Sequence, residues 1–321
     1  MGRDNRIDNL RAIAIFLVVL GHSIIIYDPS WGQISTSVEC LPFFYLKKII
    51  NLIQMPLFFS ISGFCFRLSR NQSFSIELFA NKTKRILIPY FVVCILYMDP
   101  IKILLDVPGY TFSLDLFYKQ ILLLSNNGHL WYLPTLFYMI VAFSLIKKYT
   151  RKETRLWMVF IMSGFLGLLS FKITSFFSLS LFCDYFVYFI LGYQICRYKS
   201  MLFDINNGWG YFMILLPILY VVLFQHSGKI CNGVILLLAI CAVLGCYIIV
   251  SPKENAILRE LSKNSYGIYL FHSPLIYFMY MMCPNVNPLL MFAVNFFLCG
   301  MLCLGIIYLV RMCHLESLIG E

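Results

Sequence analysis

The 321-residue sequence has few charged residues for its length. Charged side chains make up only 12% of the chain, whereas soluble domains average about 25%. Hydrophobic residues reach 60% and aromatic residues 17%. This composition excludes an ordinary soluble domain and indicates a helical bundle embedded in a lipid bilayer.

Patterns that mark metal sites or hydrolase nucleophiles are also missing. The twelve cysteines form no C-x-x-C pair, and most lie in apolar runs where cysteine acts as a small hydrophobic residue. The five histidines show no H-E-x-x-H spacing, and no serine stands in a G-x-S-x-G turn. We therefore expect no metal and no resident cofactor.

Long apolar stretches are abundant. A spanning helix needs about 20 mostly apolar residues. Ten stretches qualify, at 10–27, 45–68, 86–105, 131–146, 156–171, 179–196, 209–224, 233–250, 266–282 and 288–310. The shorter stretch 114–124 carries Asp115 and Lys119 and predicts an interfacial or re-entrant helix. We predict an all-α integral membrane protein with about ten transmembrane helices. It forms a single domain over residues 1–321, with no appended soluble domain.

The distribution of lysine and arginine predicts the orientation, because cytoplasmic loops retain these residues. With ten spans both termini share one side, and nineteen of the 25 Lys and Arg residues fall there. We therefore predict cytoplasmic termini. The remaining six are assigned to the outer side: Lys47, Lys48, Lys102, Lys119, Lys172 and Lys229. Topology thus explains much of the net charge of +10, and no nucleic-acid partner is indicated.

The first span, "DNLRAIAIFLVVLGHS", places a cation near one end and a histidine near the other. Arg11 and His22 are eleven residues apart. At 100° per residue they lie within about 20° of each other on one helix face, and about 16 Å apart along the axis. Arg11 is thus expected at the cytoplasmic edge and His22 in the outer half of the membrane.

Ordinary interpretations of these residues remain open. Arg11 can serve topology alone, and His22 can be a hydrogen-bonded bundle histidine. Asp8 or Asn9 can cap the helix start, and Asp8 can pair with Arg11 at i+3. Ionisable groups inside spans are costly, however, and usually face a cavity or partner. Histidine also suits proton transfer near neutral pH.

Five stretches, taken in order, resemble the signatures of one family. The opening "RIDNLRAIAIFLVVLGH" contains its Arg, ten intervening residues and His. "MPLFFSISGFCF", "KTKRILIPY", "HLWYLPTLF" and "SYGIYLFHSPL" resemble its later signatures. On these stretches the chain is identified as a member of membrane acyltransferase family 3. It is most similar to short fucose O-acetylase-like members.

The resemblance implies an O-acyltransferase of a bacterial cytoplasmic membrane. It implies a cytoplasmic acyl-CoA donor, with acetyl-CoA expected, and a hydroxyl of a surface polysaccharide or lipid-linked sugar as acceptor. Arg11 would bind the anionic donor, together with basic residues at neighbouring helix ends, because guanidinium groups suit phosphates; those residues are Arg67, Lys82 and Arg85. Topology alone is the alternative explanation for that cluster. The acyl group, the sugar and the oligomeric state stay open.

His22 is the expected catalytic residue. It would act as general base, taking the proton of the acceptor hydroxyl during attack on the thioester. A covalent acyl-histidine is the less favoured variant. Three further residues are candidates for binding the acceptor or lining the site, with structural roles as the alternatives: His272, His129 and Trp131.

Several other residues have weaker assignments. Asp8 and Asp184 are supporting candidates, and Asp184 could orient His22 or His272. Pro274 follows His272 and predicts a local kink that opens backbone groups. Ser60, Ser62 and Gly63 favour close helix packing over a nucleophile. His226 and His314 receive no function.

Two other function classes compete. Intramembrane His and Asp residues also mark the paths of transporters or flippases. Transporters often contain two related halves, and the two halves of this chain show no obvious repeat. In a non-catalytic scaffold the Arg11 and His22 pair would be incidental.

Overall fold

The computed structural model describes residues 4–319 except 126, 148, 175 and 225–231. Within these ranges the chain is built from helices and has no strand. His226 and Lys229, which were named above, lie outside the described residues.

Eight helices in the described part of the chain are long and apolar enough to cross a membrane, which confirms an all-α multi-pass membrane protein. They match eight of the ten predicted spans. These are α2 (Leu41–Leu68), α3 to α5 (Ile76–Leu104), α7 with its preceding turn (Gly128–Ile146), α8 with its following turn (Glu153–Lys172), α9 (Leu179–Arg197), α11 (Asn207–Phe224), α12 (Asn232–Ile249) and α14 with α15 (Pro288–Met312).

The other two predicted spans are also helices, α1 (Asn5–Ser23) and α13 (Ala256–Met282). Both are long enough to span, but polar residues lower their hydropathy. α1 begins with Arg6, Asp8 and Arg11, and α13 carries several tyrosines and His272. Both helices therefore exist where predicted, and the total of ten spans stays a prediction.

The start of α1 differs from the prediction. The N-cap is Asp4, whose carboxylate accepts a hydrogen bond from the Arg6 backbone N–H at 3.2 Å. Asp8 and Asn9, the expected caps, lie inside the helix and are buried. The earlier cap wins because Asp4 already satisfies a free N–H of the first turn. Asp8 therefore projects from an established helix.

The third span contains two local changes of helix type. It starts at Ile76, well before the predicted residue 86. Ser75 caps the helix there, and its first turns are too polar for an apolar stretch to indicate them. Thr83–Leu87 and Cys94–Met98 are π-helical. Each such turn admits an extra residue and re-aims the side chains that follow. The predicted short helix near residues 114–124 is confirmed as α6 (Leu114–Phe117) and a π turn at Tyr118–Leu122.

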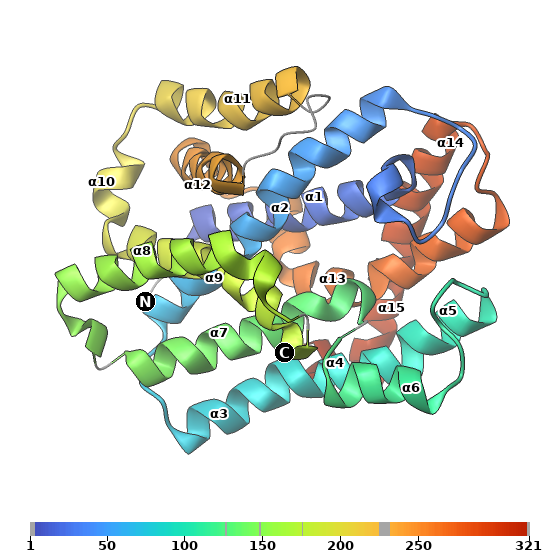
Figure 1. Cartoon of the computed structure of the whole chain (residues 1–321), viewed down its shortest axis with the longest axis horizontal. Coiled ribbons are helices and arrows are strands. Elements are labelled where there is room, and N and C mark those ends of the chain that lie inside the picture. Colours follow the sequence, from blue (N-terminus) through green and yellow to red (C-terminus); the bar gives the residue numbers. More distant parts are fainter. Residues whose placement is uncertain (1–3, 126, 148, 175, 225–231, 320–321) are drawn as a thin grey trace.

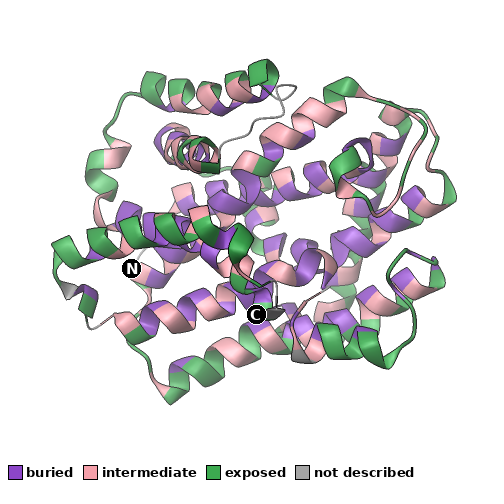
Figure 2. Cartoon of the chain, in the orientation of Figure 1, coloured by how far each residue is buried: buried purple, intermediate pink, exposed green. Residues whose placement is uncertain are grey.

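The core lies where α1, α2, α9 and α13 pack together. Figure 1 shows α1 beside α2 and α13 in the middle of the bundle, and Figure 2 shows their buried faces against the exposed α8 and α11. A Cβ atom at Gly63 would overlap the Phe189 carbonyl, and one at Gly192 would overlap the Ser60 backbone. The two glycines thus let α2 and α9 touch backbone to backbone, as expected for the small residues of α2.

Candidate active site

Three histidines from separate parts of the chain meet inside the bundle. The ring centroids of His22 and His272 lie 4.9 Å apart, and those of His129 and His272 lie 5.3 Å apart. His129 and His272 are buried, whereas His22 keeps partial accessibility. We call His22, His129 and His272 the histidine cluster. The structure thus brings together all three histidines singled out in the sequence.

A proline positions one member of this cluster. Pro274 has no N–H, so the carbonyl of Leu270, four residues earlier, loses its helical partner. The Nε2 atom of His129 pairs with that carbonyl at 3.0 Å. The Tyr97 hydroxyl donates to the neighbouring Phe271 carbonyl at 2.9 Å. The predicted opening of backbone groups near Pro274 is confirmed, and it ties η6 (Gly128–Trp131) to α13.

The end of α1 is held by tight local packing. The Tyr280 hydroxyl donates to the His22 carbonyl at 2.6 Å. A Cβ atom on Gly21 would lie 3.2 Å from Lys47 Nζ and 3.0 Å from Gln54 Oε1. Lys47 Nζ therefore lies beside Gly21, the residue that precedes His22, and its charge acts on the His22 ring.

A second buried lysine borders the cluster from the third span. Lys102 has no exposed surface, and its Nζ lies 4.1 Å from the ring centroid of Tyr110 and 4.4 Å from that of Tyr277. Its charge acts on both His22 and His129. From the sequence, Lys47 and Lys102 had been assigned to topology only, so two charged neighbours of the histidine cluster were missed.

The other end of α1 carries Arg11 in a set of weak polar contacts. Its guanidinium lies 3.4 Å from the Asp8 carboxylate, which confirms the predicted i+3 pair. It also lies 3.5 Å from Ser262 Oγ and 3.5 Å from Cys65 Sγ. The Arg11 side chain stays 33% exposed, so it remains accessible from this face. Asp8 also accepts a hydrogen bond from Ser262, and it thereby holds the guanidinium in place.

The other predicted donor-binding residues divide into two groups. Lys82 lies near Arg85, and also near Cys65, the residue that contacts Arg11. We call Arg11, Lys82 and Arg85 the basic cluster. Arg67 instead packs its guanidinium 4.8 Å from the ring centroid of Tyr193 on α9.

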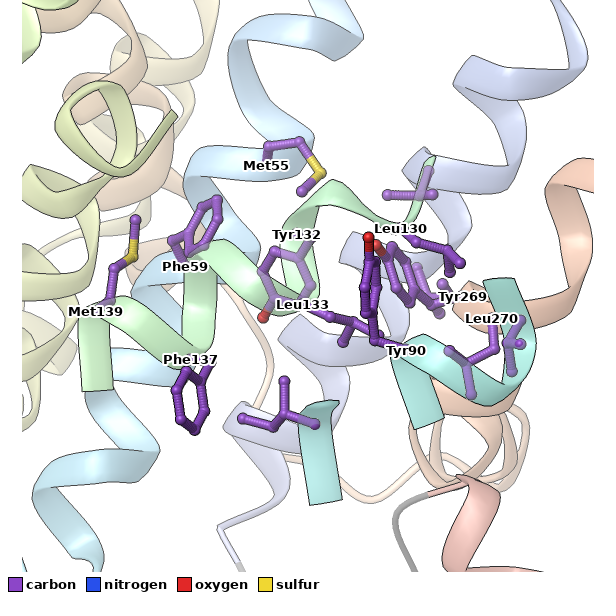
Figure 3. Packing of buried hydrophobic residues seen from close by; sticks show 14 of the residues in the cluster. Met55, Phe59, Tyr90, Leu130, Tyr132, Leu133, Phe137, Met139, Tyr269 and Leu270 are labelled. Atoms are coloured by element: carbon purple, nitrogen blue, oxygen red, sulfur yellow. The ribbon is translucent and has the colours of Figure 1, made fainter. Parts of the chain in front are cut away.

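A series of polar and aromatic contacts connects the two clusters. Arg11 acts electrostatically on Tyr132, whose hydroxyl lies 2.8 Å from Ser62 Oγ. The Tyr132 and Tyr269 ring centroids are 5.5 Å apart, and the Tyr269 hydroxyl donates to the His129 carbonyl. Figure 3 shows Tyr132 and Tyr269 in one packed group with Phe59 and Tyr90. Side-chain contacts through the interior of the bundle therefore connect the two clusters.

Trp131 packs on Tyr185, which lines a neighbouring cavity together with Asp184. The Trp131 and Tyr185 ring centroids are 5.2 Å apart. Asp184 accepts a hydrogen bond from the Ser170 hydroxyl and, with Tyr185, lines a cavity of about 540 Å³. The structure thus gives Asp184 a partner outside the histidine cluster. The cavity also reaches Asn51, which accepts a hydrogen bond from Gln54 beside Gly21.

The loop after α1 is fixed by a buried carboxylate. Asp28 accepts hydrogen bonds from the backbone N–H and the hydroxyl of Ser30. It also forms an ion pair with Lys48 at 2.9 Å. Burial alone would raise the pKa of Asp28, but the bonds from Ser30 and Lys48 outweigh it and lower the pKa below its usual range. Lys48 therefore anchors the chain between α1 and α2, one residue from Lys47.

The arrangement agrees with a comparison against known families. The family model described as an acyltransferase domain matches residues 4–312. The chain belongs to membrane acyltransferase family 3. No curated protein and no solved structure matches it.

Membership in membrane acyltransferase family 3 implies acyltransferase activity, with an acyl donor and an acceptor, in a multi-pass membrane protein. It does not favour a transporter or flippase. The described residues hold no group of three or more His, Cys, Asp or Glu side chains arranged to bind a metal ion. The histidine cluster and the basic cluster are therefore the candidate reacting and binding groups.

Proposed function

We propose that this acyltransferase moves an acyl group, acetyl in the simplest case, from cytoplasmic acyl-CoA to a sugar hydroxyl. The acceptor is a surface polysaccharide or its lipid-linked precursor. One observation carries the proposal: a single helix, α1, presents an accessible arginine at one end and joins a buried histidine cluster at the other.

The basic cluster is the proposed binding site for the donor head. An acyl-CoA carries phosphates on its nucleotide, and a guanidinium binds phosphate through paired charge-assisted hydrogen bonds. Arg11 is accessible and held by Asp8, while Lys82 and Arg85 add positive charge around Cys65. Arg67, packed on Tyr193, contributes charge from the neighbouring helix end. The extended arm of the donor can then cover the roughly 16 Å between Arg11 and His22.

His22 is the proposed catalytic base. As the acceptor hydroxyl oxygen attacks the thioester carbonyl, its proton passes to the His22 imidazole. The tetrahedral intermediate collapses with cleavage of the carbon–sulfur bond, and the CoA thiolate takes the proton from the imidazolium. The products are the acyl ester and CoA. Lys47 and Lys102, whose charges act on His22, supply positive charge where the oxyanion develops.

The acceptor is proposed to reach His22 from the side of the 540 Å³ cavity. Tyr185, backed by Trp131, offers an aromatic face there, and Asn51 and Asp184 offer hydrogen bonds. Sugars combine apolar ring faces with hydroxyl edges, so both types of group suit them. Asp184 is thus a supporting residue on the acceptor side.

The proposed topology has ten spans, with α1 and α13 added to the eight apolar helices, and cytoplasmic termini in a bacterial cytoplasmic membrane. α1 and α13 pack against each other in the bundle. Their polar residues then face protein instead of lipid, as intramembrane polar groups require.

The deciding experiment is a transfer assay with purified protein. Radiolabelled acetyl-CoA is incubated with the protein in lipid nanodiscs and a panel of surface-glycan oligosaccharides. We expect base-labile radiolabel on a glycan, with His22→Ala as the control for label that is carried without chemistry. Absence of labelled glycan, together with uptake of labelled sugar into proteoliposomes, would replace the proposal with a transporter.

A further inference from the structure

Three buried polar atoms around the histidine cluster have no hydrogen-bond partner among the described residues. They are Lys102 Nζ, His129 Nδ1 and His272 Nε2. Lys102 and His272 have no exposed surface, and His129 is 6% exposed. A buried polar group without a partner costs free energy. Three such groups in one place therefore point to a ligand that satisfies all of them.

The backbone contacts of the two histidines define what each free nitrogen offers. His272 Nδ1 lies 2.9 Å from the carbonyls of Ile268 and Tyr269, so it carries the proton. His129 Nε2 lies 3.0 Å from the Leu270 carbonyl, so there Nε2 carries it. In the neutral rings, His272 Nε2 and His129 Nδ1 are consequently hydrogen-bond acceptors.

Lys102 supplies the complementary groups. An ammonium has three donors and no acceptor. Its Nζ stands between the rings of Tyr110 and Tyr277 and beside Gly128, where a Cβ would approach it to 2.8 Å. Gly128 is therefore the neighbour that leaves room for the ammonium next to His129, and its φ of +51° favours glycine as well.

We propose that Lys102, His129 and His272 form a subsite for two adjacent hydroxyl groups, a vicinal diol of the acceptor sugar. Each hydroxyl donates a hydrogen bond to one histidine nitrogen, and its oxygen accepts a hydrogen bond from the Lys102 ammonium. The inference rests on the proposed transfer to a sugar. It adds Lys102 to the acceptor site and specifies the acceptor as a polyol with neighbouring free hydroxyls close to His22.

Two other ligand classes fit these atoms less well. A carboxylate would satisfy Lys102 but would face two nitrogen lone pairs with its own lone pairs. A metal ion would be repelled by the ammonium. A diol is the simple group that has two donors for the histidines and lone pairs for the lysine.

Binding of minimal probes to the full-length protein in nanodiscs tests the subsite without any acyl donor. The probes are cis-cyclohexane-1,2-diol, cyclohexanol and cyclohexanecarboxylate, followed by saturation-transfer NMR. We expect the diol to bind about tenfold or more tightly than cyclohexanol, as one added hydrogen bond to a charged group would give. Equal binding of diol and alcohol, or preferred binding of the carboxylate, would overturn the subsite.

Variants that keep the structural contacts sharpen this test. Lys102→Met keeps an unbranched chain without donors. His272→Asn keeps a donor near the Nδ1 position, and His129→Gln keeps one near Nε2, while each removes the free nitrogen. We expect all three to lose the preference for the diol. Lys119→Met, at an exposed pair with Asp115, is the matched control and keeps it.

The binding and transfer experiments fail independently. If the diol binds selectively but no glycan receives label from acetyl-CoA, the subsite stands and the proposed acyl transfer falls. If label is transferred and the three variants bind the diol as tightly as the wild type does, the subsite falls and the proposed acyl transfer stands.

Discussion

The two ends of α1 show opposite ways of placing a polar side chain in a membrane bundle. At one end Arg11 has protein partners, Asp8, Ser262 and Cys65, and keeps a third of its side chain accessible. At the other end His22 joins two buried histidines and two buried lysines, where several polar atoms lack a partner. The side chain at the first end has its partners within the protein, whereas we propose that a ligand supplies them at the second.

This difference fits the proposed division of roles, in which Arg11 binds the donor and His22 takes part in the acyl transfer. A paired, accessible arginine can exchange weak partners for a phosphate at small cost. Buried groups without partners are costly in the resting protein, and a bound substrate that pairs with them would remove that cost. Preorganised polar groups are how active sites stabilise reacting groups. We therefore expect substitutions at the two ends to change different kinetic constants.

The largest expected effect is at the histidine end. His22→Ala should lower kcat by about 10²- to 10⁴-fold, the usual contribution of a general base, with little change in the donor KM. Steady-state kinetics of acetyl transfer measure both constants. His314→Ala, at an exposed residue beyond the bundle, is the control. A variant rate near that of the wild type would remove His22 from the chemistry.

The next effect is at the arginine end. Arg11→Ala should raise the donor KM by about ten- to a hundredfold, because a charge-assisted hydrogen bond contributes about 1.5–3 kcal/mol. The acceptor KM should stay unchanged. Titration with acetyl-CoA and with the acceptor separates the two constants, and Arg259→Ala, at an exposed pair with Glu254, is the control. An unchanged donor KM would contradict the proposed role of Arg11.

A substitution between the two ends should disturb both together. Gly192→Ala forces a methyl group into the Ser60 backbone of α2, and overpacking of this kind costs about 1–3 kcal/mol. We expect a lower Tm in detergent and a parallel loss at both sites. Gly300→Ala, which has open space around it, should leave Tm unchanged. Equal stability of the two variants would show that α2 and α9 can separate.

The smallest effect concerns the loop beside the histidine end. Asp28→Asn should lower stability by about 1 kcal/mol through loss of the Lys48 pair. Since the folded pKa of Asp28 lies below its unfolded value, this stabilisation is present above about pH 4. It is lost as the pH falls through the folded pKa. Thermal unfolding of both proteins against pH measures it, and a difference that grows toward acid would contradict the assignment.

Most of the spanning helices, and the part of the site that lies on α1 and at Pro274, could be predicted from the sequence. Apolar length located a helix at each of the ten predicted spans, although polar first turns made some helices begin earlier than predicted, as before Ile86. Helical periodicity placed Arg11 and His22 on one face. Pro274 predicted a free backbone carbonyl, and His129 hydrogen-bonds to that carbonyl, which belongs to Leu270. These features depend on local geometry, which spacing along one helix determines.

The rest depends on contacts between distant segments. Lys47 and Lys102 were assigned only to the outer side of the membrane because counting treats every lysine alike, while their burial depends on which helices surround them. The meeting of His129 with His272 joins residues far apart in the chain. Ser170, the partner of Asp184, likewise lies at the end of the preceding helix, in a contact that spacing alone does not predict.

The π turn at Cys94–Met98 has a consequence for how this site can change over generations. The turn holds one more residue than an α-helical turn would. Deleting that extra residue would restore the α-helix and leave Lys102 on nearly the same face, because the turn confines the additional residue. Deleting a residue between the turn and Lys102, where the helix is α-helical, would instead rotate Lys102 by about 100° around the helix axis and take its ammonium away from the histidine cluster. The site can therefore tolerate a change of length inside the turn, whereas the same change a few residues later would alter it.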